Sequence, residues 1–236
     1  MATDVKSLPA IMRSKGWHKG AALMESWFAR PAKAKPDLDT PETTIIKMDW
    51  VLGFARAKAV YDKLVEDRVW QNKAAQAEIT RMLRKKSLLL KNSCFQIPFG
   101  NLDLSVEQLD ADYINQRTLG MTTDLDDMSA ALGNFVFNVI VSGRVRSNDS
   151  GPGFYVDIHE VGIYVKDSYD FEGEQFLGYW DADDNSVSMF NFLSGTRIEN
   201  KDFREWRTKN RKGGDFLLYS DLKRIRRTKP DTFFTQ

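Results

Sequence analysis

The segment with the most side chains capable of chemistry is Asp167-Ser-Tyr-Asp-Phe-Glu-Gly-Glu174. It follows a stretch that is typical of a β-strand. If the strand continues, Asp167 and Tyr169 project on one side and Asp170 on the other; if the chain turns at Ser168, both Asp carboxylates approach one point. Two carboxyl groups whose pKa values are pushed apart can divide the acid and base roles of catalysis. The alternative is an Asx-turn that closes a hairpin, with Tyr169 packed behind it.

The same segment has the ligand chemistry of a divalent-cation site. Carboxylates are the hard oxygen ligands that Mg²⁺ and Ca²⁺ take, and Asp167, Asp170 and Glu172 form the predicted set. His159 stands beside Glu160 within a predicted strand and is a further candidate for a catalytic base. The other interpretation of His159 is a histidine satisfied by ordinary hydrogen bonds. Mg²⁺ is the one cofactor that the sequence suggests.

Three other motifs are weaker. Residues 181–185, Asp-Ala-Asp-Asp-Asn, begin like a calcium loop, but Ser186 and Phe192 stand where an EF-hand needs Gly and Glu, so a hairpin turn is expected. Cys94 has no histidine near it in sequence, which argues against a nucleophile. Gly213-Gly214 follows a predicted helix, whereas phosphate cradles precede one, so a helix-ending turn is expected there.

The elements that must position these residues change in character near residue 95. Before it, apolar residues recur at spacings of three and four, which predicts a helix over residues 49–66 and another from Val69 toward Leu90. Residues 1–30 predict one broken helix or two short ones, because Gly16 and Gly20 interrupt the pattern. Three prolines within residues 31–41 predict an extended linker or loop.

After residue 95 the alternation is that of strands. Apolar alternation predicts a strand beginning at Phe135, a turn over 147–153, and a returning strand over 154–166. Side-chain parity changes near His159–Glu160, which predicts a bulge or strong twist there. Further strands are predicted over three ranges: 175–180, 187–193 and 215–222.

Two helices are predicted within this second part. Ser105 and Gln108 form a capping box that opens a short helix toward Gln116. Asn200 is the predicted cap of a helix that runs to about Asn210. The predicted fold class is therefore α+β, with N-terminal helices followed by a mainly antiparallel sheet or partial barrel that carries one late helix. The predicted domains are an N-terminal helical segment and linker (1–36), a helical subdomain (37–94) and a β-rich domain (95–236).

Composition excludes several classes of protein. The chain has 236 residues, one cysteine and two histidines, and a formal net charge of +1. One cysteine excludes an intramolecular disulfide framework and a thiolate zinc cluster. No apolar run is long enough to span a membrane, and no apolar region of a signal peptide follows the N-terminus.

The balanced net charge conceals a segregation along the sequence. Residues 1–94 carry 18 Lys and Arg against 10 Asp and Glu, residues 95–200 carry 5 against 18, and residues 201–236 carry 11 against 5. Either the basic ends pair with the acidic centre, or the acidic centre collects cations. The basic clusters at 81–86 and 223–227 also permit a nucleic-acid surface, but the acidic centre would repel phosphates, so no stable nucleic-acid complex is expected. Trp27-Phe28 are predicted core residues, or a partner-binding face if the N-terminal segment is detached.

Part of the chain resembles a known catalytic region. A strand with glycines, Ala131-Leu-Gly-Asn-Phe-Val-Phe137, leads through a hairpin into Tyr164-Val-Lys-Asp-Ser-Tyr-Asp-Phe171. Residues 130–180 thereby resemble the catalytic half of colicin-M-type bacteriocins, which hydrolyse a lipid-linked peptidoglycan precursor with Mg²⁺. Asp167, Tyr169 and Asp170 match the Asp-x-Tyr-Asp part of that signature, whereas the His-Arg pair that follows it is replaced by Phe176-Leu177.

A wider resemblance covers most of the chain. Four segments carry it: Met48-Asp-Trp-Val-Leu-Gly-Phe-Ala-Arg56, Asp167-Ser-Tyr-Asp-Phe171, Gln175-Phe-Leu-Gly-Tyr-Trp180 and Gly213-Gly-Asp-Phe-Leu-Leu-Tyr-Ser-Asp221. Together they resemble an uncharacterised bacterial family encoded near type VI secretion and polymorphic-toxin loci.

These resemblances imply an effector or toxin of antagonism between bacteria. Its chemistry would be metal-assisted hydrolysis of a phosphate-containing envelope precursor, with Asp167, Tyr169, Asp170 and His159 as catalytic candidates. The implied partners are a secretion-spike or adaptor protein and a cognate immunity protein. The implied location is synthesis in the bacterial cytoplasm without a signal peptide, followed by secretion into a target cell. The alternative is a non-catalytic binding or adaptor module of a secretion system.

Overall fold

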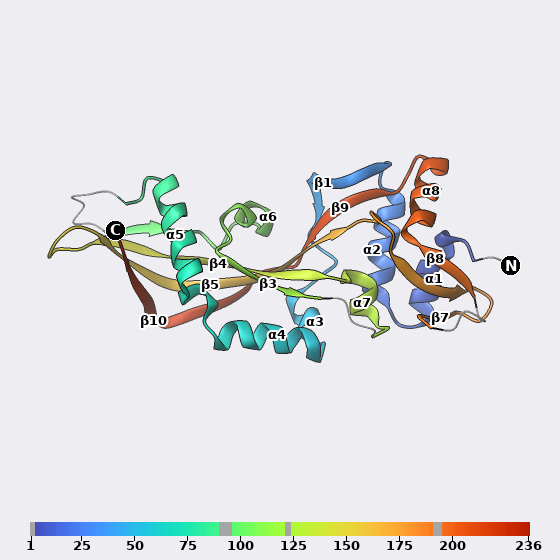
Figure 1. The fold of residues 1–236 in the computed structure, drawn as a ribbon, viewed down its shortest axis with the longest axis horizontal. Helices are drawn as coiled ribbons and strands as arrows, with labels where there is room; N and C mark the ends of the chain where they lie inside the picture. The colour runs from blue at the N-terminus through green and yellow to red at the C-terminus, as the bar shows by residue number, and fades with distance from the viewer. Residues whose placement is uncertain (1–2, 90–95, 121–123, 191–194) are drawn as a thin grey trace. The chain divides into compact units, whose positions relative to one another are not determined.

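The computed structural model describes residues 3–89, 96–120, 124–190 and 195–236 (Figure 1). The chain forms two compact units, each assembled from three separate segments. Unit 1 comprises residues 1–47, 120–135 and 166–219, and unit 2 comprises 48–119, 136–165 and 220–236. Helices and strands occur in similar amounts, so the predicted α+β class is confirmed. The domain boundaries predicted at 36 and 94 stay a prediction.

The described helices of unit 1 come from its N-terminal and C-terminal segments and from one short insertion. They are η1 (Val5–Ser7), α1 (Leu8–Ser14), α2 (His18–Ala29), α7 (Asp127–Leu132) and α8 (Asn200–Asn210). Gly16 has a φ of +78° between α1 and α2, a left-handed conformation that glycine adopts without strain. The prediction of two short helices in residues 1–30 is confirmed, and the break lies at Gly16 alone.

The strands of unit 1 form two open sheets. In the first, β1 (Lys33–Glu42) pairs in parallel with β9 (Gly214–Tyr219), and β9 pairs antiparallel with Lys166–Tyr169, the last residues of β5 (Phe154–Tyr169). In the second, β6 (Phe176–Asp181) lies between β7 (Ser186–Ser188) and β8 (Thr196–Glu199), antiparallel to both. The predicted linker at 31–41 is therefore mostly a strand. Its position at the end of the strand order tolerates prolines, which lack the N–H that an inner strand must donate.

An aromatic cluster forms the core of unit 1. Trp27 is fully buried, and its ring packs edge-on against Phe28, Phe171 and Phe203 at centroid distances of 5.2, 4.9 and 5.6 Å. The indole N–H donates to Asp215 at 2.8 Å, so the one polar atom of the ring is satisfied. The suggestion that Trp27-Phe28 form a detached partner-binding face is wrong, because both rings are inside the core.

The described helices of unit 2 all lie within residues 48–119. They are α3 (Met48–Val51), α4 (Ala55–Glu66), η2 (Val69–Gln71), α5 (Lys73–Lys85), α6 (Val106–Leu109) and η3 (Asp110–Asp112). The single helix predicted over 49–66 is broken around Gly53, a residue with low helix propensity, and Phe54 is extended. The helix predicted from Val69 begins instead at Lys73, because the Asn72 side chain caps it by accepting from the Ala75 N–H at 2.9 Å.

The sheet of unit 2 is built on long strands. β5 lies between β10 (Lys223–Thr235) and β4 (Phe135–Ser147), and both β2 (Ile97–Phe99) and β3 (Asn115–Leu119) pair with β4. The hairpin predicted through 147–153 is present. Glu160 pairs with Arg226 while Ile158 pairs with Asp231, so the register shifts at His159. The predicted irregularity at His159–Glu160 is confirmed.

The remaining predictions have mixed outcomes. The helix predicted from Ser105 toward Gln116 is shorter, because α6 and η3 end at Asp112. The late helix is α8 as predicted, although its cap is Glu199 rather than Asn200. Cys94, Phe192 and part of the strand predicted over 187–193 lie outside the described residues. None of the described helices is both long and apolar enough to cross a membrane.

Candidate functional site

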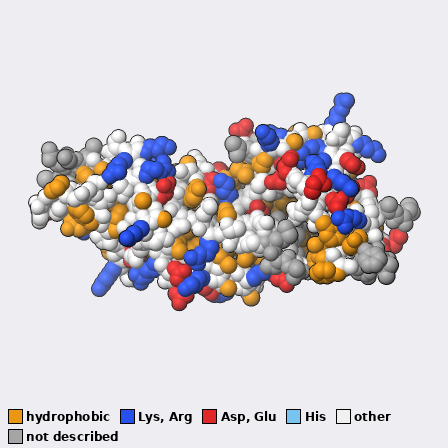
Figure 2. All heavy atoms as spheres, in the orientation of Figure 1, with side chains coloured by type: hydrophobic (Ala, Val, Ile, Leu, Met, Phe, Trp, Pro, Cys, Tyr) orange, Lys and Arg blue, Asp and Glu red, His pale blue; other side chains and the backbone are white. Residues whose placement is uncertain are grey.

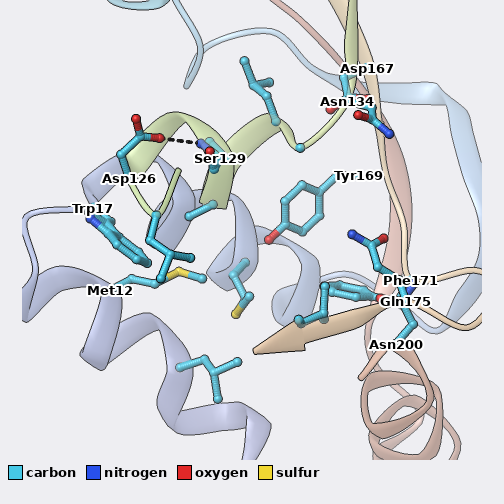
Figure 3. Close-up of a pocket in the computed structure, with 18 of the residues that line it drawn as sticks. Met12, Trp17, Asp126, Ser129, Asn134, Asp167, Tyr169, Phe171, Gln175 and Asn200 are labelled. Atoms are coloured by element: carbon cyan, nitrogen blue, oxygen red, sulfur yellow. Dashed lines mark hydrogen bonds between the residues drawn. The ribbon is translucent and has the colours of Figure 1, made fainter. Parts of the chain in front are cut away.

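Unit 1 contains a cavity of about 410 Å³ at the end of β5 (Figure 3). Residues 167–171 form one side of it. Three other parts of unit 1 complete the lining: Leu8, Met12, Trp17 and Met24 near the N-terminus, residues 124–126 and 129–134 around α7, and Gln175–Leu177 with Trp180, Met189 and Asn200. The predicted segment therefore lies in a pocket whose wall is mainly apolar.

Asp167 lies where β5 pairs with β9, with its Cα opposite Leu218. One carboxylate oxygen accepts the Ser168 N–H at 2.8 Å, and no described residue donates to the other. Burial among protein atoms raises the pKa of the Asp167 carboxyl well above its ordinary value of 3.8, and repulsion from Asp170 raises it further. The side chain still keeps part of its surface open to the cavity. Asp167 is thus a carboxyl group that holds its proton more tightly than usual.

Asp170 has a different environment. The Ser168 hydroxyl donates to one of its oxygens at 2.7 Å, and the Glu172 N–H donates to the other at 3.2 Å. Both hydrogen bonds fix the orientation of the carboxylate. The bond from Glu172 closes an Asx-turn after the end of β5, as the turn alternative expected. The chain does not turn at Ser168, because β5 continues to Tyr169, yet Asp167 and Asp170 both line the cavity.

Tyr169 lies between Asp167 and Asp170 in sequence, and its side chain points into the cavity (Figure 3). Its ring stacks on Phe216 at 5.3 Å and meets Phe171 edge-on at 5.7 Å, so its position is fixed from two sides. The residue is only 8% exposed, yet its hydroxyl makes no hydrogen bond to any residue that the structure describes. Burial raises the pKa of the Tyr169 hydroxyl, which therefore stays protonated. A buried tyrosine hydroxyl usually finds a partner, so this one is available to a ligand.

Helix α8 holds the loop that follows Asp170. The Arg204 guanidinium donates to the Phe171 carbonyl at 2.8 Å and also reaches the Glu174 carboxylate at 2.9 Å. The Asn200 side chain donates to the Glu172 carbonyl at 2.6 Å, and its backbone N–H donates to the Gln175 carbonyl at 3.0 Å. These bonds fix the backbone that presents the Glu172 N–H to Asp170.

Helix α7 contributes another part of the cavity wall and packs closely against α2. A Cβ placed on Gly20 would be 2.7 Å from the Ala130 Cβ, so only glycine fits at this contact. The Asp127 carboxylate accepts the backbone N–H groups of Lys19 and Gly20 at 3.1 and 2.8 Å, which satisfies donors that the start of a helix leaves unpaired. The sequence pattern marks the α1 and α2 positions only as apolar, so it does not distinguish pocket wall from core.

Two predicted site residues are not brought to this cavity. His159 belongs to unit 2, where it is exposed and borders a shallow depression with Arg144 and Ser142. The Glu172 side chain is exposed and does not line the cavity; only its backbone contributes, through Asp170. Among the described residues, no group of three or more His, Cys, Asp or Glu side chains is placed to hold a metal ion.

The weaker motifs are structural where the structure describes them. Asp181 accepts the Asp183 and Asp184 N–H groups at 2.9 and 3.3 Å in the turn between β6 and β7, as expected for a hairpin. Gly213 has a φ of +92° after the end of α8, and a Cβ there would strike the Trp27 ring. The predicted helix-ending turn is therefore also a close-packing site.

The basic tail pairs with acidic side chains within unit 2. Arg224 binds Glu160 at 2.8 Å and Asp103 at 2.6 Å, and Lys223 binds Asp49 at 2.7 Å. Basic and acidic side chains lie side by side at several places on the face shown in Figure 2. Pairing between the basic tail and the acidic centre is thus present for Arg224.

Comparisons with known proteins give a family and no activity. No curated protein and no solved structure matches the chain. The sequence matches a family of unknown function, DUF6402, over residues 3–197 and 193–235. Because this match covers nearly the whole chain, the protein belongs to the DUF6402 family of unknown function.

Proposed function

We propose that this protein is an effector of antagonism between bacteria and that the cavity of unit 1 is its hydrolytic site. One observation carries the enzymatic part of the proposal: Asp167 and Asp170 line the same cavity in different environments. Burial raises the pKa of the Asp167 carboxyl, whereas the Asp170 carboxyl accepts hydrogen bonds from Ser168 and Glu172. Such a pair is what acid–base hydrolysis requires. The antagonism rests on the sequence resemblances alone.

The two carboxyl groups take complementary roles. Asp170, positioned by hydrogen bonds from Ser168 and Glu172, accepts a proton from the attacking water as the water oxygen bonds to the substrate. Asp167, whose pKa is raised by burial, donates its proton to the leaving oxygen as the scissile bond breaks. One proton enters the pair and one leaves it, so the step is balanced. The Tyr169 hydroxyl donates a hydrogen bond to an oxygen of the reacting group.

The finer part of the proposal is a lipid-linked, phosphate-containing envelope precursor as substrate. The apolar lining suits a lipid, but the cavity presents carboxylates to a phosphate. Mg²⁺ would offset that repulsion, and Asp170 is the oxygen ligand that would hold it beside the substrate, while Asp167 keeps its proton for the leaving oxygen. One or two carboxylates with substrate phosphates are a common way to bind Mg²⁺, so the described residues fit the ion without Glu172.

The partners and location are part of the same proposal. The protein is made in the cytoplasm of one bacterium, mounted on a secretion-spike or adaptor protein, and neutralised there by a cognate immunity protein. The Asp-x-Tyr-Asp signature and the four-segment resemblance support this. No contact of the described residues bears on it.

Growth of bacteria that express the chain tests the proposal. We expect expression in the periplasm, where envelope precursors are exposed, to slow growth, and Asp167→Asn or Asp170→Asn to remove this effect. Asp184→Asn is the matched control, because Asp184 is an exposed aspartate of unit 1 outside the cavity. Thermal unfolding of the purified variants shows whether they remain folded. Growth inhibition that survives both cavity substitutions would refute the hydrolytic site.

A non-catalytic binding module is the second candidate. It is favoured by the replacement of His-Arg with Phe176-Leu177 and by the placement of His159 away from the cavity lining. Harmless expression in both the periplasm and the cytoplasm would support it. Deleting residues 1–36 is unsuitable as a test, because the deletion removes Trp27 from the core of unit 1.

A further inference from the structure

We infer that the cavity of unit 1 selects a ligand group that carries an ammonium charge on an apolar body. The inference uses the site of the proposed function but goes beyond it, because it names an ammonium group as the ligand that binds at Asp167 and Tyr169 without added metal. It concerns binding and does not need hydrolysis to occur.

The charge of the lining is the first argument. The cavity is lined by four aspartates, Asp124, Asp126, Asp167 and Asp170, and its described lining contains no Lys, Arg or His. Arg204 and Arg207 of the neighbouring helix α8 are not part of the lining and are bound by loop carbonyls and by Asp215. A cation in this cavity therefore meets carboxyl groups and no basic side chain of the described lining. The same carboxylates would repel a bare phosphate, and the low dielectric of a partly enclosed site strengthens this repulsion.

Open hydrogen-bond acceptors are the second argument. The second oxygen of Asp167 receives no hydrogen bond from the described residues, and the Tyr169 hydroxyl has no partner among them although it is 92% buried. Both are directed to the cavity, which distinguishes them from a solvated acidic surface. An ammonium group has three donors and no acceptor, so it suits acceptors such as the Asp167 oxygen and a lone pair of the Tyr169 oxygen.

The apolar wall is the third argument. Trp17 and Trp180 meet edge-on at 6.3 Å, and Met12, Met24 and Met189 add flexible apolar surface. Aromatic rings attract cations, and methionines adapt to irregular apolar shapes. A volume of about 410 Å³ is within the range of small-molecule sites. The lining thus suits a charged end and an apolar body in one ligand.

The experiment compares three probes of one chain length on the full-length protein without added metal. Hexylamine, hexanol and hexyl phosphate are titrated by NMR. We expect hexylamine to bind about tenfold tighter than hexanol, as one charge-assisted hydrogen bond provides, and hexyl phosphate to bind more weakly than hexanol. Tyr169→Phe should weaken hexylamine more than hexanol, and Asp167→Asn should reduce the preference for hexylamine. Asp184→Asn should leave the preference unchanged.

Two results would overturn the inference. One is equal affinity for hexylamine and hexanol, and the other is tighter binding of hexyl phosphate, with or without Mg²⁺. Binding of hexyl phosphate only with Mg²⁺ would contradict the ammonium preference and leave the metal-assisted hydrolase standing. Selective hexylamine binding by a protein that is harmless in both compartments would refute the proposed hydrolysis and leave the inference standing.

Discussion

Two tyrosines of this chain differ in what their hydroxyl groups do. The Tyr164 hydroxyl donates to Asp110 at 2.6 Å and accepts from the Asn138 amide at 3.3 Å, inside unit 2. Tyr169 is almost as buried, but no described residue bonds its hydroxyl. The Tyr169 hydroxyl lines the cavity, so it can be hydrated or bind a ligand, whereas the Tyr164 hydroxyl is committed to its protein partners.

Substitution by phenylalanine separates the two roles. Tyr164→Phe should lower the free energy of unfolding by about 1–2 kcal/mol, because the buried Asp110 and Asn138 groups lose a partner. Tyr169→Phe should change it by less than about 0.5 kcal/mol, because no hydrogen bond to a described residue is lost. Urea denaturation of both variants measures the difference. Equal destabilisation would show that the Tyr169 hydroxyl already has a structural partner.

Asp167 gives the folded protein an unusual dependence on pH. A carboxyl group whose pKa is higher in the folded state holds its proton more tightly there, so unfolding stability falls as pH rises from about 3.8 through the folded pKa. Asp167→Asn removes this titration. We therefore expect the variant to gain stability relative to the natural protein as pH increases over that interval, measured by chemical denaturation at several pH values.

Asp157 is the control of opposite sign. Burial opposes its ionisation, but hydrogen bonds from Arg146 and Thr232 lower the pKa of its carboxyl overall. Its contribution is present above the ordinary pKa and is lost as pH falls, so Asp157→Asn should be most destabilising near neutrality. A gain for Asp167→Asn that is the same at all pH values would contradict the raised pKa.

At the scale of elements, short local signals were sufficient for several predictions. The turn at 147–153, the irregularity at His159 and the late helix α8 all follow from a few neighbouring residues. The break near Gly53 and the strand at residues 33–42 were missed. The break is local and follows from the low helix propensity of glycine, whereas β1 depends on a partner distant in sequence, because β9 pairs with it.

The contact between α2 and α7 shows how such partners shape the site. Gly20→Ala should destabilise unit 1 by about 1–2 kcal/mol. The clash of the added methyl with Ala130 costs more free energy than the higher helix propensity of alanine provides. Adding Ala130→Gly should recover part of the loss. A double-mutant cycle by urea denaturation should give a coupling of about 1 kcal/mol between the two positions. A coupling near zero would show that the helices do not constrain each other there.

At the scale of the whole molecule, the balanced charge has two different origins. In unit 2, basic tail residues pair with acidic residues, as Arg224 does with Glu160 and Asp103. In unit 1, Arg207 pairs with Asp215 inside the core, and Arg204 pairs with Glu174 at the surface. The cavity of unit 1 is the place where carboxylates gather without a basic side chain in the described lining. Pairing of the basic tail with the acidic centre is therefore present for Arg224, and collection of cations by the acidic centre stays a proposal for the cavity of unit 1.

The sequence by itself determined the α+β class, most elements and the segment that forms the centre of the cavity, because these depend on periodicity, turns and residue types a few positions apart. Only the tertiary structure decided that Asp167 and Asp170 share a cavity, that His159 and the Glu172 side chain do not line it, and that the Tyr169 hydroxyl is unpartnered among the described residues. The physical reason is that the wall comes from residues 8–24, 124–134 and 175–200 as well as from the motif. Burial, and with it the pKa of Asp167, is set by these distant residues rather than by its neighbours in sequence.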